Sequence, residues 1–236
     1  MWFAIDEDGH ELGHGSALMT RSLVAKLAGR WLRRFGQVRT YYEAGPCGYW
    51  LHRVLEAAGV KNTVVAPALT PRAPGEKVKT DRRDAAKLAR MGMRGMLTAV
   101  YVPDRDHEAL RDLLRLRKAA RDEVRRVKTR ITHYLNRQGI QYRDGRRWTG
   151  RHRRWLASLR LQWPQHIVLE ELLRRLSEAE VWLRRVERRL RGALRLWRRL
   201  SAIVEAFQAV RGVGYWTAVT VVLAVSYTHL TLPTKA

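Results

Sequence analysis

Two aspartates, Asp81 and Asp84, stand at the predicted start of a helix with a spacing that could serve a metal ion or the helix itself. Thr80 precedes them and is a good N-cap residue, because its hydroxyl can accept a backbone N–H of the first turn. Residues three apart leave the same face of a helix, so the two carboxylates offer adjacent oxygen ligands. The positive end of the helix dipole also favours acids here. On spacing alone, stabilisation of the helix is the simpler interpretation.

Basic side chains surround these aspartates and would suit a ligand that carries phosphate. They are Lys79, Arg82, Arg83 and Lys87. A third acid, Glu43, ends a predicted strand, because the Ala-Gly-Pro sequence at residues 44–46 does not continue a strand. Sites in α/β proteins gather at the carboxyl ends of parallel strands, and Glu43 lies at such an end.

Short strands and helices alternate through the first hundred residues and must position these acids. Apolar runs and turn residues predict strands at residues 2–5, around Leu12, at 38–42 and at 63–66, with helices at 20–36 and 49–59. Asp6 and Asp8 fall between the first two strands and are interpreted as turn residues. This alternation predicts an α/β layer with a partly parallel sheet.

The second half of the chain is predicted to be helical. From Asp104, apolar residues alternate three and four apart up to Tyr134, with one break at Arg117. A second seam runs without a miss from Leu169 to Val204, which predicts one helix on the order of 50 Å long. The two seams predict an antiparallel coiled-coil hairpin or a dimer arm. One sequence does not distinguish these alternatives, and a homo-oligomer is expected.

A basic connector, residues 142–163, joins the two predicted helices and also contains Trp148 and Trp155. Its candidate nucleic-acid-binding residues are Arg143, Arg146, Arg147, Arg151, Arg153 and Arg154. Three histidines, His133, His152 and His166, lack the spacing of metal ligands and are expected to face solvent or nucleic acid.

The net charge of +24 and the pI near 11.3 indicate a polyanionic partner, because basic surface attracts phosphates and releases their counterions. Cys47 is the only cysteine, which excludes a disulfide framework. No apolar run reaches the roughly 18 residues of a membrane span. We therefore expect a cytoplasmic protein that binds nucleic acid and not a membrane.

Gly212 and Gly214 separate two apolar segments near the end of the chain. This arrangement resembles a helix-hairpin-helix. Glycines of this kind let the backbone approach a phosphate, although a turn between two core helices would show the same pattern. Residues 225–236 lose the helical pattern abruptly. They are similar to the translation of a sequencing adapter, so we interpret them as an artefact and exclude them from the fold.

Three features occur in order along the chain: YYEAGPCGYWLHRVLEAAG, VVAP and VKTDRRDAAKLAR. In this order they resemble the bacterial insertion-sequence transposases related to the Piv DNA invertase. The resemblance implies a RuvC-like, ribonuclease-H-like DEDD domain, then a coiled coil, then a serine transposase domain that opens with Gly-x-Gly. It implies that Glu43, Asp81 and Asp84 are the second, third and fourth catalytic acids and bind Mg²⁺. It also implies that DNA is the substrate and that a structured RNA is the guide.

The chain departs from that pattern in two places. It begins at what resembles the second strand of the family, so the first strand and its aspartate are expected to be missing. The nucleophilic serine, expected well after Gly214, is also not found before the adapter-like tail. We therefore expect an inactive copy, truncated at both ends. Its expected parts are 1–103, a partial DEDD domain; 104–206, the coiled-coil region; 207–224, the start of the transposase domain; and 225–236, the artefact.

Two other functions fit the composition. The first is a non-catalytic RNA- or DNA-binding coiled-coil protein, which would bind without Mg²⁺ and with a steep dependence on salt. The second is a structural coiled-coil oligomer whose charged residues are only a solvated face.

Overall fold

The computed structural model describes residues 1–71 and 80–224. It divides into two compact units, Met1–Val102 and Pro103–Ala236, which we call unit 1 and unit 2 and describe separately. Lys79 and the adapter-like segment 225–236 lie outside the described residues.

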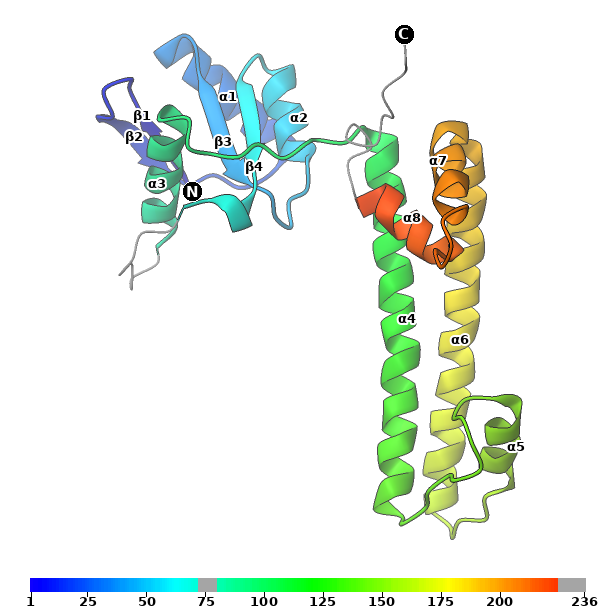
Figure 1. The fold of residues 1–236 in the computed structure, drawn as a ribbon. Coiled ribbons are helices and arrows are strands. Elements are labelled where there is room, and N and C mark those ends of the chain that lie inside the picture. The colour runs from blue at the N-terminus through cyan, green and yellow to red at the C-terminus, as the bar shows by residue number, and fades with distance from the viewer. Residues whose placement is uncertain (72–79, 225–236) are drawn as a thin grey trace. The chain divides into compact units, whose positions relative to one another are not determined.

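The described part of unit 1 contains four strands in two small sheets (Figure 1). The strands are β1 (Trp2–Ile5), β2 (Glu11–Gly15), β3 (Arg39–Glu43) and β4 (Lys61–Val65). β1 and β2 form an antiparallel hairpin, whereas β3 and β4 are parallel and place Glu43 opposite Val65. The other edge of β4 is covered by residues 98–100, through a bridge between Val65 and Ala99. Among the described residues, no strand pairs with the free edge of β1 or of β3.

The helices of unit 1 begin within one residue of their predicted starts. They are α1 (Arg21–Phe35), α2 (Trp50–Ala57) and α3 (Asp81–Met93), with a short 3₁₀ turn η1 (Pro67–Leu69) after β4. The Oγ1 atom of Thr20 accepts the N–H of Leu23 at 3.4 Å and caps α1. α1 ends at Gly36, whose φ of 71° suits a residue without a Cβ. The prediction of an α/β fold is confirmed for this unit, but the expected partly parallel sheet is divided into an antiparallel hairpin and a separate parallel pair.

Helix α3 packs against both β1 and β3. Gly92 lies against the ring of Tyr41 on β3, so closely that a Cβ on Gly92 would overlap the ring. On β1, the guanidinium of Arg90 lies 6.0 Å from the ring centroid of Phe3. One helix therefore covers strands of both small sheets.

Helix α1 makes further packing contacts in unit 1. Its buried residues Val24 and Ala28 form a core with Leu55 of α2 and Val60. The ring of Trp31 meets the ring of Trp2 on β1 edge-on, with 5.6 Å between centroids. The hairpin is thus held by α1 and α3, although no backbone ladder joins it to β3 within the described chain.

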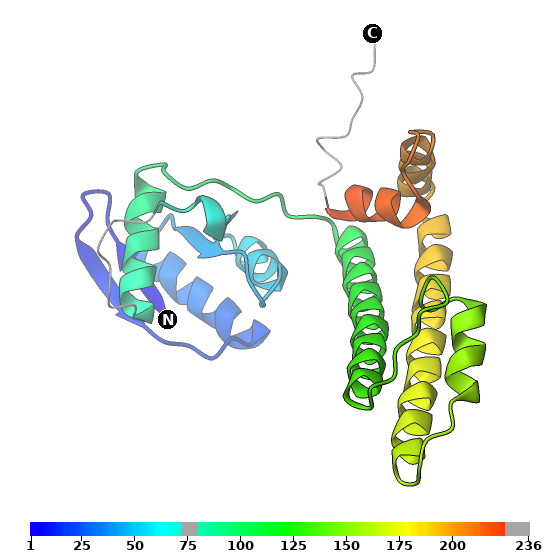
Figure 2. The ribbon, with the colours of Figure 1, turned by 60° about the horizontal axis from the view of Figure 1, so that its bottom comes forward.

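Unit 2 is built on two long antiparallel helices, α4 (Arg105–Arg137) and α6 (Gln165–Leu196). They lie side by side along most of their length (Figures 1 and 2). α5 (Gly150–Ser158) folds beside them within the connector, and α7 (Arg198–Gln208) and α8 (Tyr215–Ala224) follow α6. No helix in the described ranges is both long enough and apolar enough to cross a membrane.

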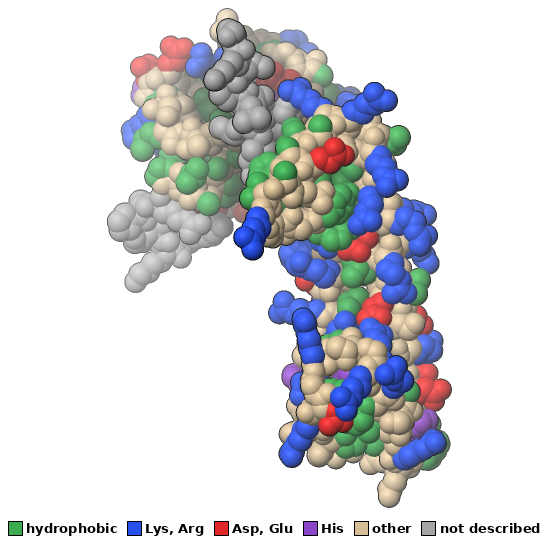
Figure 3. All heavy atoms as spheres, turned by 45° about the vertical axis from the view of Figure 1, so that its right-hand side comes forward, with side chains coloured by type: hydrophobic (Ala, Val, Ile, Leu, Met, Phe, Trp, Pro, Cys, Tyr) green, Lys and Arg blue, Asp and Glu red, His purple; other side chains and the backbone are tan. Residues whose placement is uncertain are grey.

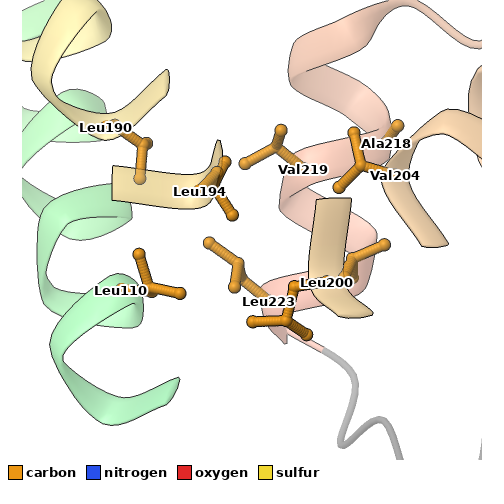
Figure 4. Packing of buried hydrophobic residues seen from close by; sticks show 9 residues of the cluster. Leu110, Leu190, Leu194, Leu200, Val204, Ala218, Val219 and Leu223 are labelled. Atoms are coloured by element: carbon orange, nitrogen blue, oxygen red, sulfur yellow. The ribbon is translucent and has the colours of Figure 1, made fainter. Parts of the chain in front are cut away.

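Two apolar clusters stabilise unit 2. The first joins the start of α4 to the end of α6, α7 and α8; Figure 4 shows Leu110, Leu190, Leu200 and Leu223 meeting there. The second lies near the connector, where Ile131 on α4 packs with residues of α5 and α6. Helices α4 and α6 therefore pack directly against each other. Their supercoiling and the self-association of the chain remain predictions.

The prediction of one unbroken helix from Leu169 to Val204 is wrong. α6 ends at Leu196, because Trp197 takes φ −103° and ψ 76°, and α7 begins at Arg198. The break lets Leu200 and Val204 pack with α8 and with α6 in one cluster. The three-four pattern continues across the break since both helices use it to face the same core.

Arg117, the break in the first seam, is buried between the helices. Its Nε donates to Glu187 Oε1 on α6 at 2.9 Å. Its guanidinium lies 4.0 Å from the ring centroid of Trp216 on α8. Arg117 thus occupies a seam position that would otherwise be apolar. Its charge is paired with Glu187 and stacked on Trp216.

Gly92→Ala is expected to destabilise unit 1 by about 1–3 kcal/mol, because the added methyl overlaps the Tyr41 ring and forces α3 away from β3. Gly29→Ala in α1 is the matched control. Its Cβ would meet only Arg33 Nη1 at 3.5 Å, so it should gain about 0.5–1 kcal/mol. Urea unfolding measures both, and equal effects would contradict the packing described.

Glu187→Ala should lower the unfolding free energy of unit 2 by about 2 kcal/mol, because it leaves the Arg117 guanidinium buried without its acid. The double variant Arg117→Met/Glu187→Leu should recover most of that loss. Arg115→Ala, which breaks only an exposed pair with Asp112, should change it by less than about 0.5 kcal/mol. A loss for Glu187→Ala no larger than for Arg115→Ala would show that the buried pair is not important.

Candidate functional site

The acidic turn of α3 forms as the sequence predicts. Thr80 Oγ1 accepts the N–H of Arg83 at 3.3 Å, and Asp81 and Asp84 occupy the first turn. Arg82 on the same turn reaches Glu11 of β2, with its Nη2 3.3 Å from both carboxylate oxygens. This pair is exposed and therefore contributes little stability. Glu11 therefore holds the guanidinium of Arg82 only weakly.

Glu43 ends β3 at the carboxyl edge of the parallel pair. Side chains two apart on a strand share a face, so Glu43 lies on the face of β3 where Tyr41 meets α3. The three acids are thus carried by elements that pack together. They do not form a group whose ligand atoms all lie within 4.8 Å of one another in the described part of the chain.

A different group meets that distance criterion: Asp6, Asp8 and His10 in the turn between β1 and β2. Asp6 Oδ1 accepts the backbone N–H groups of Asp8 at 3.1 Å and His10 at 2.8 Å. The hydrogen bond from the His10 N–H, above all, lowers the pKa of Asp6. The prediction of turn residues is confirmed, and the turn alone accounts for the grouping.

The connector folds around its aromatic residues. Tyr142, His152 and Trp155 pack together, with 4.6 Å between the ring centroids of Tyr142 and His152. The backbone N–H of Trp148 donates to His152 Nδ1 at 3.1 Å. His152 is therefore buried, and the expectation that it faces solvent or nucleic acid is wrong. The tryptophans Trp148 and Trp155 belong to the same small core.

The connector arginines surround this core on the outside, and all six predicted ones are exposed. Arg153 is engaged, because its Nη2 donates to Glu180 Oε1 at 2.7 Å. Burial opposes the charge of Glu180, but its bonds to Arg153 and Lys128 lower its pKa on balance. The other five have no acidic partner within 4 Å among the described residues, namely Arg143, Arg146, Arg147, Arg151 and Arg154. Figure 3 shows Lys and Arg side chains spread over this unit.

The two glycines of the Gly-x-Gly motif join α7 to α8. Gly212 has φ +88°, and nothing lies within 4 Å of a Cβ built on either glycine. The carbonyl of Gly214 accepts the N–H groups of Thr217 and Ala218 at 3.0 Å. The turn is open to solvent at the start of α8, so its backbone is accessible to a ligand.

Residues 2–139 match the family of DEDD transposases of the IS110 type, which is described as a transposase. This match covers more than half of the chain, and the chain belongs to that family. It is 42% identical over 188 residues to "Putative transposase y4qE" of Sinorhizobium fredii, covering 79% of this chain and 45% of that protein.

A second relative is the "Transposase for insertion sequence element IS1533" of Leptospira borgpetersenii. It is 36% identical over 142 residues, which cover 59% of this chain and 40% of that protein. The chain spans less than half the length of either relative.

Sequence reasoning missed the partners of Arg117 and the engagement of Arg82 and Arg153. The break in the apolar seam was the only signal for Arg117, and it does not identify Glu187 or Trp216. No local pattern predicts the pairs of Arg82 and Arg153, because Glu11 and Glu180 are distant in sequence.

Unit 2 should lose stability as the pH falls below about 6.5. Burial, together with the charges of Arg147 and Arg153, lowers the pKa of His152 from 6.5. Burial likewise lowers the pKa of His107. The unfolded chain then takes up protons that the folded chain does not, so stability is complete above pH 6.5 and is lost below it.

Thermal unfolding at several pH values between 7.5 and 5.5 measures the slope of the melting temperature against pH. His152→Gln should make the slope shallower, while His166→Gln, at an exposed site, should leave it unchanged. A melting temperature that stays constant or rises towards pH 5.5 would contradict the burial of these two histidines.

Proposed function

We propose that this chain is part of a DNA transposase that moves an insertion sequence by cutting and rejoining DNA. The observation that carries the proposal is the family match over residues 2–139, which contains Glu43 and the acidic turn of α3. Glu43, Asp81 and Asp84 are the proposed catalytic acids. The basic composition supports DNA as the substrate.

A divalent ion fits the chemistry of these acids. Three carboxylates are an all-oxygen donor set, which is the kind that Mg²⁺ prefers. Glu43, Asp81 and Asp84 would hold it, and the ion would stabilise the charged oxygens of a phosphodiester. Arg83 and the weakly held Arg82 would orient the phosphates beside it.

Nucleic acid is proposed to bind at two further places. The first is the arginine surface of the connector, and the second is the open turn at Gly212 and Gly214. Both sites suit phosphates of DNA and of the guide RNA that the resemblance implies, and they do not discriminate between the two. Self-association through the paired helices is also proposed.

The three acids present form no close three-ligand group in the described chain. We also propose that this chain binds nucleic acid without catalysing strand transfer. Strand transfer by this chain alone would contradict that expectation.

Asparagine replacement of the aspartates equivalent to Asp81 and Asp84 in a full-length relative is expected to reduce strand transfer at least about 100-fold, because it removes the negative ligands of the ion. Binding of DNA should change less than about threefold, since phosphate contacts are made by cations. A gel assay for joined strands and a binding assay measure the two.

Replacement of the residues equivalent to Asp6 and Asp8 is the control and should leave strand transfer near the wild-type level. Full activity of the Asp81/Asp84 variant would refute the assigned site. Binding with a steep salt dependence, no Mg²⁺ requirement and no strand transfer in any relative would favour a non-catalytic binding protein.

A further inference from the structure

The connector and its surroundings, residues 138–165, form a folded end of the helical pair that we call the head. It contains three tryptophans with different exposure. Trp148 and Trp155 pack in the aromatic core with Tyr142 and His152. Trp163 instead is 79% exposed. The head therefore uses two tryptophans to fold and presents the third to solvent.

The chain on either side of Trp163 is anchored. Before it, Leu159 and Leu161 pack against the apolar cluster of the head. After it, the carbonyl of Gln165 accepts the hydroxyl of Tyr134 at 2.7 Å, at the first residue of α6. The indole is thus held outside the core between two fixed points, and it is not part of a fraying end.

An exposed indole forgoes a large apolar burial, so its position needs a reason beyond folding. Two further apolar side chains follow Trp163 closely in the chain, Ile167 and Val168 on the first turn of α6, and they are 40% and 44% exposed. Large apolar side chains exposed near one another in the chain indicate a candidate contact site. The flat face of the Trp163 indole suits a partner that offers a planar ring for stacking.

The charge of the head restricts the kind of partner. The head that carries Trp163 also has six exposed arginines without an acidic partner in the described chain: Arg143, Arg146, Arg147, Arg151, Arg154 and Arg160. The acids nearest along the chain are Asp144 and Glu170, with Glu171, which is paired with Arg174. The excess of cations favours a partner that carries both phosphates and accessible flat rings. Unpaired nucleotides have both.

We propose that Trp163 stacks on an unpaired base of a single-stranded or bulged nucleic acid whose phosphates are held by the arginines of the head. The proposal rests on the proposed function, in which the chain binds nucleic acid, and it specifies that the head recognises unpaired bases. A regular duplex keeps its bases stacked inside and would engage only the arginines. RNA and DNA share the required chemistry, so the head discriminates by strand state.

Binding of labelled oligomers of about 12 nucleotides tests this on the whole chain. The probes are a single-stranded RNA, a single-stranded DNA and a DNA duplex, measured by fluorescence anisotropy at several salt concentrations. Trp163→Ala should weaken binding of the unpaired strands about tenfold and of the duplex less than about twofold. The slope of affinity against salt should not change, because stacking releases no counterions.

Three variants serve as controls. Trp163→Phe should retain most of the affinity for unpaired strands, since it keeps an aromatic face. Leu196→Ala removes another highly exposed apolar side chain, 83% exposed, and should have no effect. Arg151→Gln/Arg154→Gln should weaken all three probes and reduce the salt slope. Circular dichroism checks that each variant is folded.

A loss on the single-stranded RNA, the single-stranded DNA or both supports the proposal and identifies the source of the base. Unchanged binding of unpaired strands by Trp163→Ala, or an equal loss on the duplex, overturns it. So does a change of oligomeric state alone, which would assign Trp163 to a protein interface. Failure of the wild-type chain to bind any probe would contradict the proposed function as well.

Discussion

The contact between Gly92 and the ring of Tyr41 sets how closely helix α3 approaches β3, and the placement of Asp81 and Asp84 relative to Glu43 depends on it. α3 is the element that packs on both β1 and β3, and it carries Asp81 and Asp84 on its first turn. Only a residue without a side chain allows the helix to come so close to the strand. Without this approach the acidic turn would not be fixed relative to β3, which carries Glu43.

Unit 2 folds although its many positive charges repel one another. The apolar clusters at its two ends hold α4 and α6 together, and acids such as Glu123, Glu180 and Glu187 pair with cations between them. The remaining cations are directed outwards, where salt screens their repulsion. A partner that carries phosphate would neutralise them, so binding and the stability of this unit are coupled through the same charges.

Local features of the fold follow from the sequence, and features that depend on distant residues do not. Thr80, Gly36 and the end of β3 at Glu43 are set by neighbouring residues, so they could be predicted. The break at Trp197 could not, because the apolar alternation is the same for one helix or two. Likewise, composition does not tell a tryptophan that packs, such as Trp155, from one that is exposed, such as Trp163. The acids were identified by resemblance, while their spacing alone favoured a simple helix start.

The central claim is that Glu43 and the acidic turn of α3 form the metal-binding edge of unit 1. Manganese is a paramagnetic substitute for magnesium, and it broadens the NMR signals of amides close to it. Titration of the whole chain with Mn²⁺ should first broaden the amides of residues 80–85 and of Glu43 and Ala44. Broadening confined to the turn of Asp6, Asp8 and His10, with no effect on α3, would contradict the claim.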